Sequence, residues 1–436
     1  MSRHADISLP WASEAVRDRV QQIQAASEPG TAEDLERASR AVQTHIEAMD
    51  ANGLVLYAGT NAMTGAVAAG HDVQLGVRPS LGNPAEKVQP GLKHLEVLEV
   101  LTTRAVAATM RACYADVRVQ SATLANLAVY AGLTPVGATI AALPRSGGGH
   151  FSHHREGAAG IRGHRVVELP YDVAAQDVDV DALPDFLDRE RPALVILGGA
   201  LMLFPHRLDR ILVVTKAFGV PVLYDASHVA GLIAGGHFQQ PLDDGIDVVT
   251  FSTYKSYGGP PGGAIATRDP EVAERVFAAV YPGLTANFDA GRLRALGIAA
   301  ADLLNHGESY GTRCIEAARA LGRTLADGGL RLAGADRGFT ASHHLAITLP
   351  DAHAAQWAIG SLERAGIYVS AAEVATERGP IAAIRLGTQE LVRRGFTAAD
   401  MPAIGTPIAR VLAGESPVDV SSTVAALRRD RSLSHA

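Results

Sequence analysis

The fold is decided by the stretch from Val222-Leu-Tyr-Asp225-Ala-Ser-His228 to Val248-Val-Thr-Phe-Ser252-Thr-Tyr254-Lys255-Ser-Tyr-Gly-Gly-Pro-Pro-Gly262-Gly263. It contains two short apolar runs, which we predict to be buried parallel strands, and polar side chains follow each run. Asp225 and His228 come after the first run, and Lys255 comes after the second. Because ligands of open α/β sheets bind at the carboxyl ends of the strands, we expect these side chains to meet in one site.

A carboxylate and a lysine at one edge of a sheet indicate a cofactor that is held at two points. Pyridoxal 5′-phosphate needs this pair, an amine for a Schiff base and an acid that faces the pyridinium nitrogen. Taken singly, Asp225 is more typical of a cap or turn, and Lys255 is more typical of a solvated surface. Lys255 is, however, followed by a glycine-rich loop that lets the backbone approach a ligand closely. We therefore predict pyridoxal phosphate, bonded to Lys255, with Asp225 at its ring nitrogen.

Two further motifs predict contacts to the cofactor and to the substrate. Ser121 and Thr123 precede a helix-like run over residues 124–133, so their hydroxyls and the free N–H groups of the first turn form a phosphate seat. An ordinary N-cap is the alternative interpretation. Arg385 carries two parallel donors, which suit the α-carboxylate of an amino acid.

His150 follows three glycines, which predicts a loop that faces a ligand. Its imidazole either stacks on an aromatic ring or acts as an acid or base near neutral pH. His153 and His154 follow without an accompanying cysteine, so we predict no metal site and interpret them as part of an exposed polar loop. We interpret Arg393 and Arg394 as surface charges.

In order and spacing, these motifs resemble those of the serine hydroxymethyltransferases, which belong to the fold-type I pyridoxal phosphate enzymes. The resemblance covers roughly residues 50–400 and rests on residues 119–130, 147–153, 225–232, 252–263 and 384–396. It implies proton transfer by His150, His228 or Tyr254, between which the sequence does not choose, and substrate binding by Arg385. It also implies cofactor contacts from Ser121, Ala122, Thr123, His150, Asp225, His228, Ser252, Lys255, Gly262 and Gly263.

The chain departs from this family where the family handles folate and protons. A Tyr-x-Glu-Gly-x-Pro-Gly stretch of the family appears as Pro79-Ser-Leu81-Gly-Asn-Pro84-Ala, so its tyrosine and its glutamate are both missing. Tyr254 replaces a histidine before the lysine, and Pro261 replaces an arginine in the loop that follows. A Gly-Gly pair that the family contributes from the partner subunit appears as Ala286-Asn287.

The function that we expect is therefore the making or breaking of the Cα–Cβ bond of a β-hydroxy-α-amino acid through a glycine quinonoid. The enzyme would be an aldolase or transaldolase that does not use folate. One alternative is a serine or α-methylserine hydroxymethyltransferase that uses other groups in place of the missing glutamate. A different class of alternative is an amino-acid racemase or a pyridoxal phosphate-binding protein without turnover.

Composition and patterning predict the organisation of the chain. We expect a helical arm over residues 1–50, a large cofactor-binding α/β domain with a mainly parallel sheet of the seven-stranded type over 51–282, and a smaller α+β domain over 283–436. A net charge of −7 with no basic run argues against a nucleic-acid partner. No apolar run reaches membrane-spanning length and residues 1–8 contain no signal core, so we expect a cytoplasmic protein. The expected partners are a small amino acid, an aldehyde, and a second copy of the chain in a homodimer or a dimer of dimers.

Overall fold

The computed structural model describes residues 7, 9–26, 31–429 and 431. The chain divides into two compact units, Met1–Gly53 and Leu54–Ala436. The first unit contains the helices α1 (Glu14–Ala25) and α2 (Ala32–Asn52), neither of which has a buried residue. No described helix is both long and apolar enough to cross a membrane.

The larger sheet formed by the described residues has seven strands. In spatial order they are β2 (Tyr114–Asp116), β10 (Gly263–Thr267), β9 (Val248–Ser252), β8 (Val222–Asp225), β7 (Val195–Gly198), β3 (Thr139–Ala142) and β4 (Arg165–Glu168). Neighbours from β9 to β4 pair in parallel, whereas β10 pairs antiparallel with β9 and β2. The predicted mainly parallel sheet of seven strands is confirmed.

The continuous apolar runs form strands because both faces of this sheet are covered. All residues of β7, β8 and β9 are buried, as expected for parallel strands between two layers of helices. Leu223 of β8 packs in a cluster with side chains of α6 (Ala122–Leu133) and α12 (Pro270–Ala278). Its neighbours Val222 and Tyr224 point to the other face and join the cluster of α9 (Leu208–Ala217) and α13 (Leu293–Asp327).

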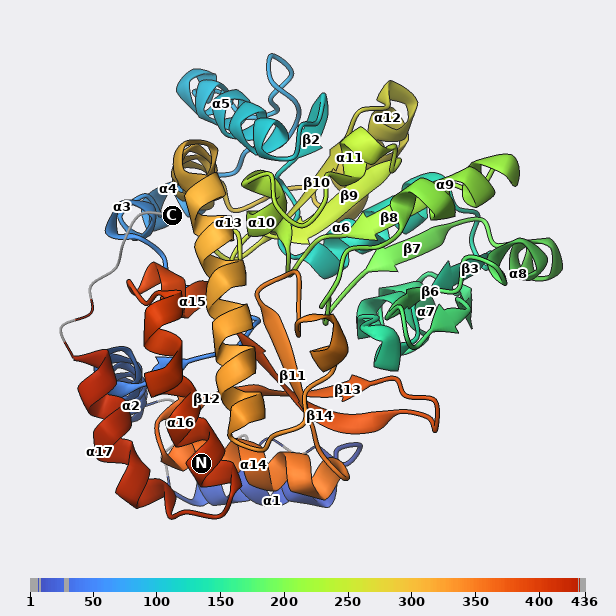
Figure 1. Ribbon diagram of the computed structural model, residues 1–436. Coiled ribbons are helices and arrows are strands. Elements are labelled where there is room, and N and C mark those ends of the chain that lie inside the picture. Colours follow the sequence, from blue (N-terminus) through green and yellow to red (C-terminus); the bar gives the residue numbers. More distant parts are fainter. Residues whose placement is uncertain (1–6, 8, 27–30, 430, 432–436) are drawn as a thin grey trace. The chain divides into compact units, whose positions relative to one another are not determined.

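A smaller antiparallel sheet lies at the other end of the second unit. Its order is β11 (His344–Thr348), β14 (Ile381–Gly387) and β13 (Ser370–Val374). Figure 1 shows α13 running alongside both sheets, and it packs on α5 (Lys93–Thr109) as well as on α16 (Met401–Leu412). The long helix thereby joins the two sheets in one compact unit. The predicted boundary between a large and a small domain at residue 282 stays a prediction.

The remaining elements are short or lie on the periphery. β1 (Leu54–Val55) pairs in parallel with β12 (Ile367–Tyr368), so the start of the second unit is tied to its C-terminal part. The other helices and strands are α3 (Gly65–Ala68), α4 (Val73–Gly76), α7 (Ala158–Ile161), β5 (Tyr171–Asp172), β6 (Asp177–Val178), α8 (Leu183–Glu190), α10 (Ala230–Ala234), α11 (Pro241–Asp244), α14 (Ala352–Arg364), α15 (Gln389–Arg393) and α17 (Pro417–Arg428).

Candidate active site

A cavity of about 660 Å³ lies beyond the carboxyl ends of β7, β8 and β9. It brings together all predicted site residues except the two glycines, namely Ser121, Ala122, Thr123, His150, Asp225, His228, Ser252, Tyr254, Lys255 and Arg385. Gly262 and Gly263 are not among the described residues that line it. The register explains the convergence, because Asp225 at the end of β8 pairs with Thr250 near the end of β9.

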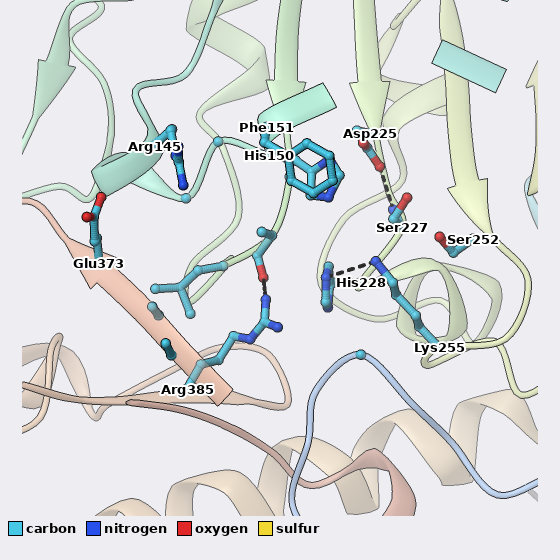
Figure 2. Close-up of a pocket in the computed structure, with 18 of the residues that line it drawn as sticks. Arg145, His150, Phe151, Asp225, Ser227, His228, Ser252, Lys255, Glu373 and Arg385 are labelled. Atoms are coloured by element: carbon cyan, nitrogen blue, oxygen red, sulfur yellow. Dashed lines mark hydrogen bonds between the residues drawn. The ribbon is translucent and has the colours of Figure 1, made fainter. Parts of the chain in front are cut away.

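The amine of Lys255 points into the cavity from the loop after β9 and contacts His228 (Figure 2). Its Nζ lies 3.1 Å from Nε2 of His228, and Nδ1 of His228 lies 3.1 Å from the carbonyl oxygen of Ala58. The carbonyl only accepts, so we assign the ring proton to Nδ1, which leaves Nε2 to accept from the lysine. Burial, aided by the charge of Arg385 and opposed by that of Asp225, lowers the pKa of Lys255 to about 8.

Asp225 is almost completely buried and is surrounded by donors. His153 Nε2 lies 2.9 Å and Asn126 Nδ2 3.2 Å from its Oδ2, while the backbone N–H of Ser227 donates to Oδ1 over 2.9 Å. Burial alone would raise the pKa of Asp225. The hydrogen bond from His153 and the charges of His153 and His150 outweigh it, so the pKa lies well below its ordinary value. The carboxylate therefore stays ionised in a buried place.

The interpretation of His153 and His154 as parts of an exposed loop is wrong. Only 1% of His153 and 8% of His154 is exposed, because the turn after the glycines folds them inward. Tyr130 of α6 lies 2.6 Å from His153 Nδ1, and His154 Nε2 lies 3.2 Å from the carbonyl oxygen of Leu143. Nothing in the local sequence distinguishes these rings from solvated ones, since their partners lie far away in the chain.

Ser121 both faces the cavity and caps α6. Its Oγ accepts from the backbone N–H of Leu124 over 3.2 Å, so the N-cap and the cavity-lining role occur together. Gly263 packs closely against this turn, because a Cβ on it would lie only 2.5 Å from the carbonyl carbon of Ser121. A Cβ on Gly262 would lie 2.1 Å from the guanidinium carbon of Arg292. The two glycines therefore make room for close packing outside the cavity wall.

Arg385 reaches the cavity from β14, in the smaller sheet, and lies on the side away from Asp225 (Figure 2). Only 8% of the residue is exposed. Its Nη1 donates to the carbonyl of Ala200, and its Nε has no hydrogen-bond partner. No carboxylate of the described residues forms an ion pair with it. A buried guanidinium without an ion-pair partner is suited to bind the carboxylate of a substrate.

His150 lies on the cavity wall beside Phe151, with the ring centroids 4.1 Å apart. Burial, together with the charges of His153, Lys255 and Arg385, lowers the pKa of His150 to about 4, although Asp225 opposes the shift. The imidazole is therefore neutral at neutral pH and presents a flat, uncharged ring.

Several lining residues had no signal in the sequence that singled them out. Asn126 lies inside the phosphate motif, and its amide links Asp225 to Thr250 of β9. Arg145 and Glu373 both line the end of the cavity that is remote from Lys255 (Figure 2). The backbone N–H of Ala375 donates a hydrogen bond of 2.9 Å to the carbonyl of Ser146, which joins the two segments that carry these side chains.

Arg393 and Arg394 are also placed differently from the prediction. They are 1% and 5% exposed, respectively, so the interpretation as surface charges is wrong. Arg393 pairs with Asp302 of α13 over 2.6 Å, and Arg394 pairs with Glu390 over 2.9 Å. Burial of these cations depends on acidic partners, which are remote in sequence in the case of Asp302.

The cavity fits pyridoxal phosphate. Asp225 offers an ionised carboxylate, Lys255 an amine, and the start of α6 its free N–H groups beside Ser121. Ser227 lines the same space, and its buried Oγ has no hydrogen-bond partner. An unpartnered buried hydroxyl is expected where a ligand completes the hydrogen bonding.

Comparison with known proteins agrees with this geometry. The profile of the family "Serine hydroxymethyltransferase" matches residues 35–408. An alpha-methylserine aldolase of Variovorax paradoxus is 40% identical over 433 residues, covering 97% of this chain and 96% of that protein. A serine hydroxymethyltransferase of Pyrobaculum calidifontis is 38% identical over 357 residues, covering 81% and 83%.

The fold also matches a solved structure. The crystal structure of L-threonine transaldolase from Pseudomonas fluorescens in the internal aldimine state superposes with a TM-score of 0.83 and 24% identity, covering 94% of this chain and 93% of that one. This likeness concerns the fold, while the profile match and the more similar relatives establish the family. The chain belongs to the serine hydroxymethyltransferase family of pyridoxal phosphate-dependent enzymes.

Proposed function

We propose that this protein is an aldolase that splits a β-hydroxy-α-amino acid of the α-methylserine type, without folate, into an amino acid and an aldehyde. For α-methylserine itself, the Cα–Cβ bond breaks, the hydroxyl loses its proton, Cα takes up a proton, and the products are alanine and formaldehyde. The observation that carries the proposal is the unpaired, buried guanidinium of Arg385, which shares one cavity with Lys255 and Asp225. It provides a place for an amino-acid carboxylate beside the cofactor residues.

Each residue has a part that follows from its surroundings. Pyridoxal phosphate, when bound, supplies an electron-accepting ring, and Asp225 keeps a proton on the ring nitrogen by charge pairing. Arg385 holds the α-carboxylate and so fixes which bond of Cα faces the cofactor. Lys255, with a pKa of about 8, is partly neutral near neutral pH and is therefore a competent nucleophile and proton acceptor.

The proton of the β-hydroxyl needs an acceptor near Lys255. His228 presents Nε2 beside the lysine amine, and its Nδ1 is committed to the carbonyl of Ala58. We propose that His228 and Lys255 together form the path for this proton. His150 and Tyr254 line the same cavity and remain candidates for the second proton transfer, at Cα.

Two observations support independence from folate. Leu81 stands where the family resemblance places the proton-handling glutamate. Relatives that carry the name alpha-methylserine aldolase are 40% to 42% identical to this chain. The serine hydroxymethyltransferases at 36% to 38% identity favour a second candidate, hydroxymethyl transfer to tetrahydrofolate.

The test is to incubate the enzyme loaded with pyridoxal phosphate with α-methylserine and to measure formaldehyde and alanine, with and without tetrahydrofolate. Equal amounts of both products without folate are the expected result. A strict requirement for tetrahydrofolate would establish the second candidate instead. Because α-methylserine has no α-proton, a parallel incubation uses serine in D2O, where exchange of the α-proton without bond cleavage would indicate a racemase. Absence of any reaction with either amino acid would leave a binding protein.

Lys255→Ala is the control for the cofactor assignment. We expect this variant to lack the visible absorbance that the cofactor gains on bonding to the lysine, once free cofactor has been removed. A variant that kept the absorbance would show that another residue bonds the cofactor.

A further inference from the structure

Arg292 is a buried arginine that is not among the described residues that line the cavity. It ends the short 3₁₀ turn Ala290–Arg292 that leads into α13, and only 4% of it is exposed. Its Nη1 donates to the carbonyl of Val119 over 2.8 Å, and its Nη2 donates to the carbonyl of Gly263 over 3.1 Å. Its Nε has no partner, and no carboxylate of the described chain forms an ion pair with it.

The two carbonyls belong to the two segments that close one end of the cavity. Val119 lies two residues before Ser121, and Gly263 begins β10 after the loop of Lys255. The backbone N–H of Gly263 also donates to the carbonyl of Val119 over 3.1 Å. One planar guanidinium therefore fastens the turn before α6 to the loop that carries the lysine.

Fixing these carbonyls fixes the neighbouring N–H groups as well. A peptide unit is planar, and its C=O and N–H point in opposite directions. The carbonyl that Arg292 holds at Val119 thus sets the direction of the N–H of Gln120, one residue before the cap of α6. The arginine orders the backbone just before the helix start, where an anion would be bound.

The charge of Arg292 points to an anion as well. Burial lowers the pKa of Arg292 to about 10, although the negative charges of Asp289 and Asp116 raise it. The guanidinium therefore stays charged at neutral pH. An unpaired buried cation is costly unless an anion lies nearby. The dipole of α6 already favours negative charge at its N-terminus, and Arg292 adds a full positive charge next to the backbone just before that N-terminus.

We propose that Arg292 is a positioning residue for the phosphate group of the cofactor: it holds the backbone before Ser121 in its anion-binding arrangement and adds positive charge there. The inference rests on the proposed binding of pyridoxal phosphate. It also accounts for Gly262, since a side chain at that position would occupy the space of the guanidinium.

The test compares two ligands that differ only in the phosphate. Enzyme stripped of cofactor is titrated with pyridoxal phosphate and with pyridoxal, and the visible absorbance of the lysine-bound form gives both dissociation constants. In Arg292→Met, we expect the constant for pyridoxal phosphate to rise on the order of 100-fold and that for pyridoxal only a few-fold. Arg292→Lys keeps the charge but loses the planar guanidinium that donates to both carbonyls. In this variant, the ratio of the dissociation constant for pyridoxal to that for pyridoxal phosphate should fall on the order of tenfold.

A matched control is Arg428→Met, which removes a buried guanidinium from α17 and should leave the ratio of the two constants unchanged. Equal weakening of both ligands in Arg292→Met would overturn the inference and leave a purely structural arginine. If that variant does not fold, Arg292→Lys decides, because an unchanged ratio there also overturns the inference. Failure of the proposed cofactor binding looks different: the unaltered enzyme would then bind neither ligand at Lys255.

Discussion

Lys255 combines a nucleophilic amine with a depressed pKa, and Arg385 contributes to the depression. An amine reacts only when unprotonated, so the rate at which cofactor-free enzyme bonds pyridoxal phosphate should rise with pH through about 8. Removing the like charge in Arg385→Met should shift that midpoint to higher pH. Stopped-flow absorbance over a pH series measures it, with Arg410→Met on the exposed face of α16 as control. A midpoint that stays in place in Arg385→Met would contradict the assignment.

The burial and the protonation state of His343 cannot be predicted from the neighbouring residues in the sequence. It is fully buried, neither ring nitrogen has a partner, and burial with the charge of Arg385 lowers its pKa to about 3. The unfolded chain therefore binds a proton near pH 6.5 that the folded chain takes up only near 3, so stability falls as pH falls through this window.

His343→Phe removes this proton linkage. Between pH 6.5 and 4, we expect the free energy of unfolding of the variant to fall by about 3 kcal/mol less than that of the unaltered protein, as measured by urea unfolding. His353→Phe, on the exposed surface of α14, should keep the original pH dependence. Equal slopes for His343→Phe and the unaltered protein would show that His343 does not titrate abnormally.

At the scale of elements, the sequence predicts what depends on local periodicity and chain order. The apolar runs before Asp225 and Lys255 indicate β8 and β9, and parallel strands deliver their carboxyl ends to one edge. The burial of His153 and Arg393 could not be predicted in this way, because their partners Asp225 and Asp302 lie on elements that are distant in the sequence. Local patterns report exposure preferences, whereas burial of a charge depends on a partner that only the fold supplies.

The close packing of β10 against the turn before α6 leads to a prediction at this scale. A Cβ at Gly263 would lie 2.5 Å from the backbone of Ser121, so Gly263→Ala should force these segments apart. We expect a loss of about 1 to 3 kcal/mol in stability and weaker binding of pyridoxal phosphate, measured by thermal unfolding and by absorbance titration. Gly65→Ala, in α3, has nothing within 4 Å and should change neither property. Unaltered binding in Gly263→Ala would mean that the turn tolerates displacement.

At the scale of the molecule, the site needs both sheets of the unit Leu54–Ala436. The larger sheet supplies Asp225, the loop after its strand β9 supplies Lys255, and the smaller sheet supplies Arg385. The β1–β12 pairing and the 35-residue helix α13 hold these parts in one unit. The proposed sites for the cofactor and for the substrate carboxylate are thus set by packing that lies largely outside the cavity itself.

The segments 79–91 and 286–287 give the last prediction, because neither contributes to the described lining of the cavity in its own chain. They are joined to one another, since the backbone N–H of Ser80 donates to Asn287 Oδ1 over 2.8 Å. The family resemblance implies that the second segment serves the cavity of a partner subunit. We therefore predict a homodimer or a dimer of dimers, with a mass by light scattering that is a multiple of twice the 45.5 kDa chain.

Complementation between two inactive variants tests the shared cavity directly. Lys255→Ala removes the amine from a chain's own cavity, and Asn287→Trp should obstruct the cavity of its partner. Unfolding, mixing and refolding the two should then restore about a quarter of the original activity, because half of the dimers are mixed and each contains one intact cavity. If Asn287 instead acted within its own chain, every cavity of a mixed dimer would carry one of the two defects, and the mixture would stay inactive.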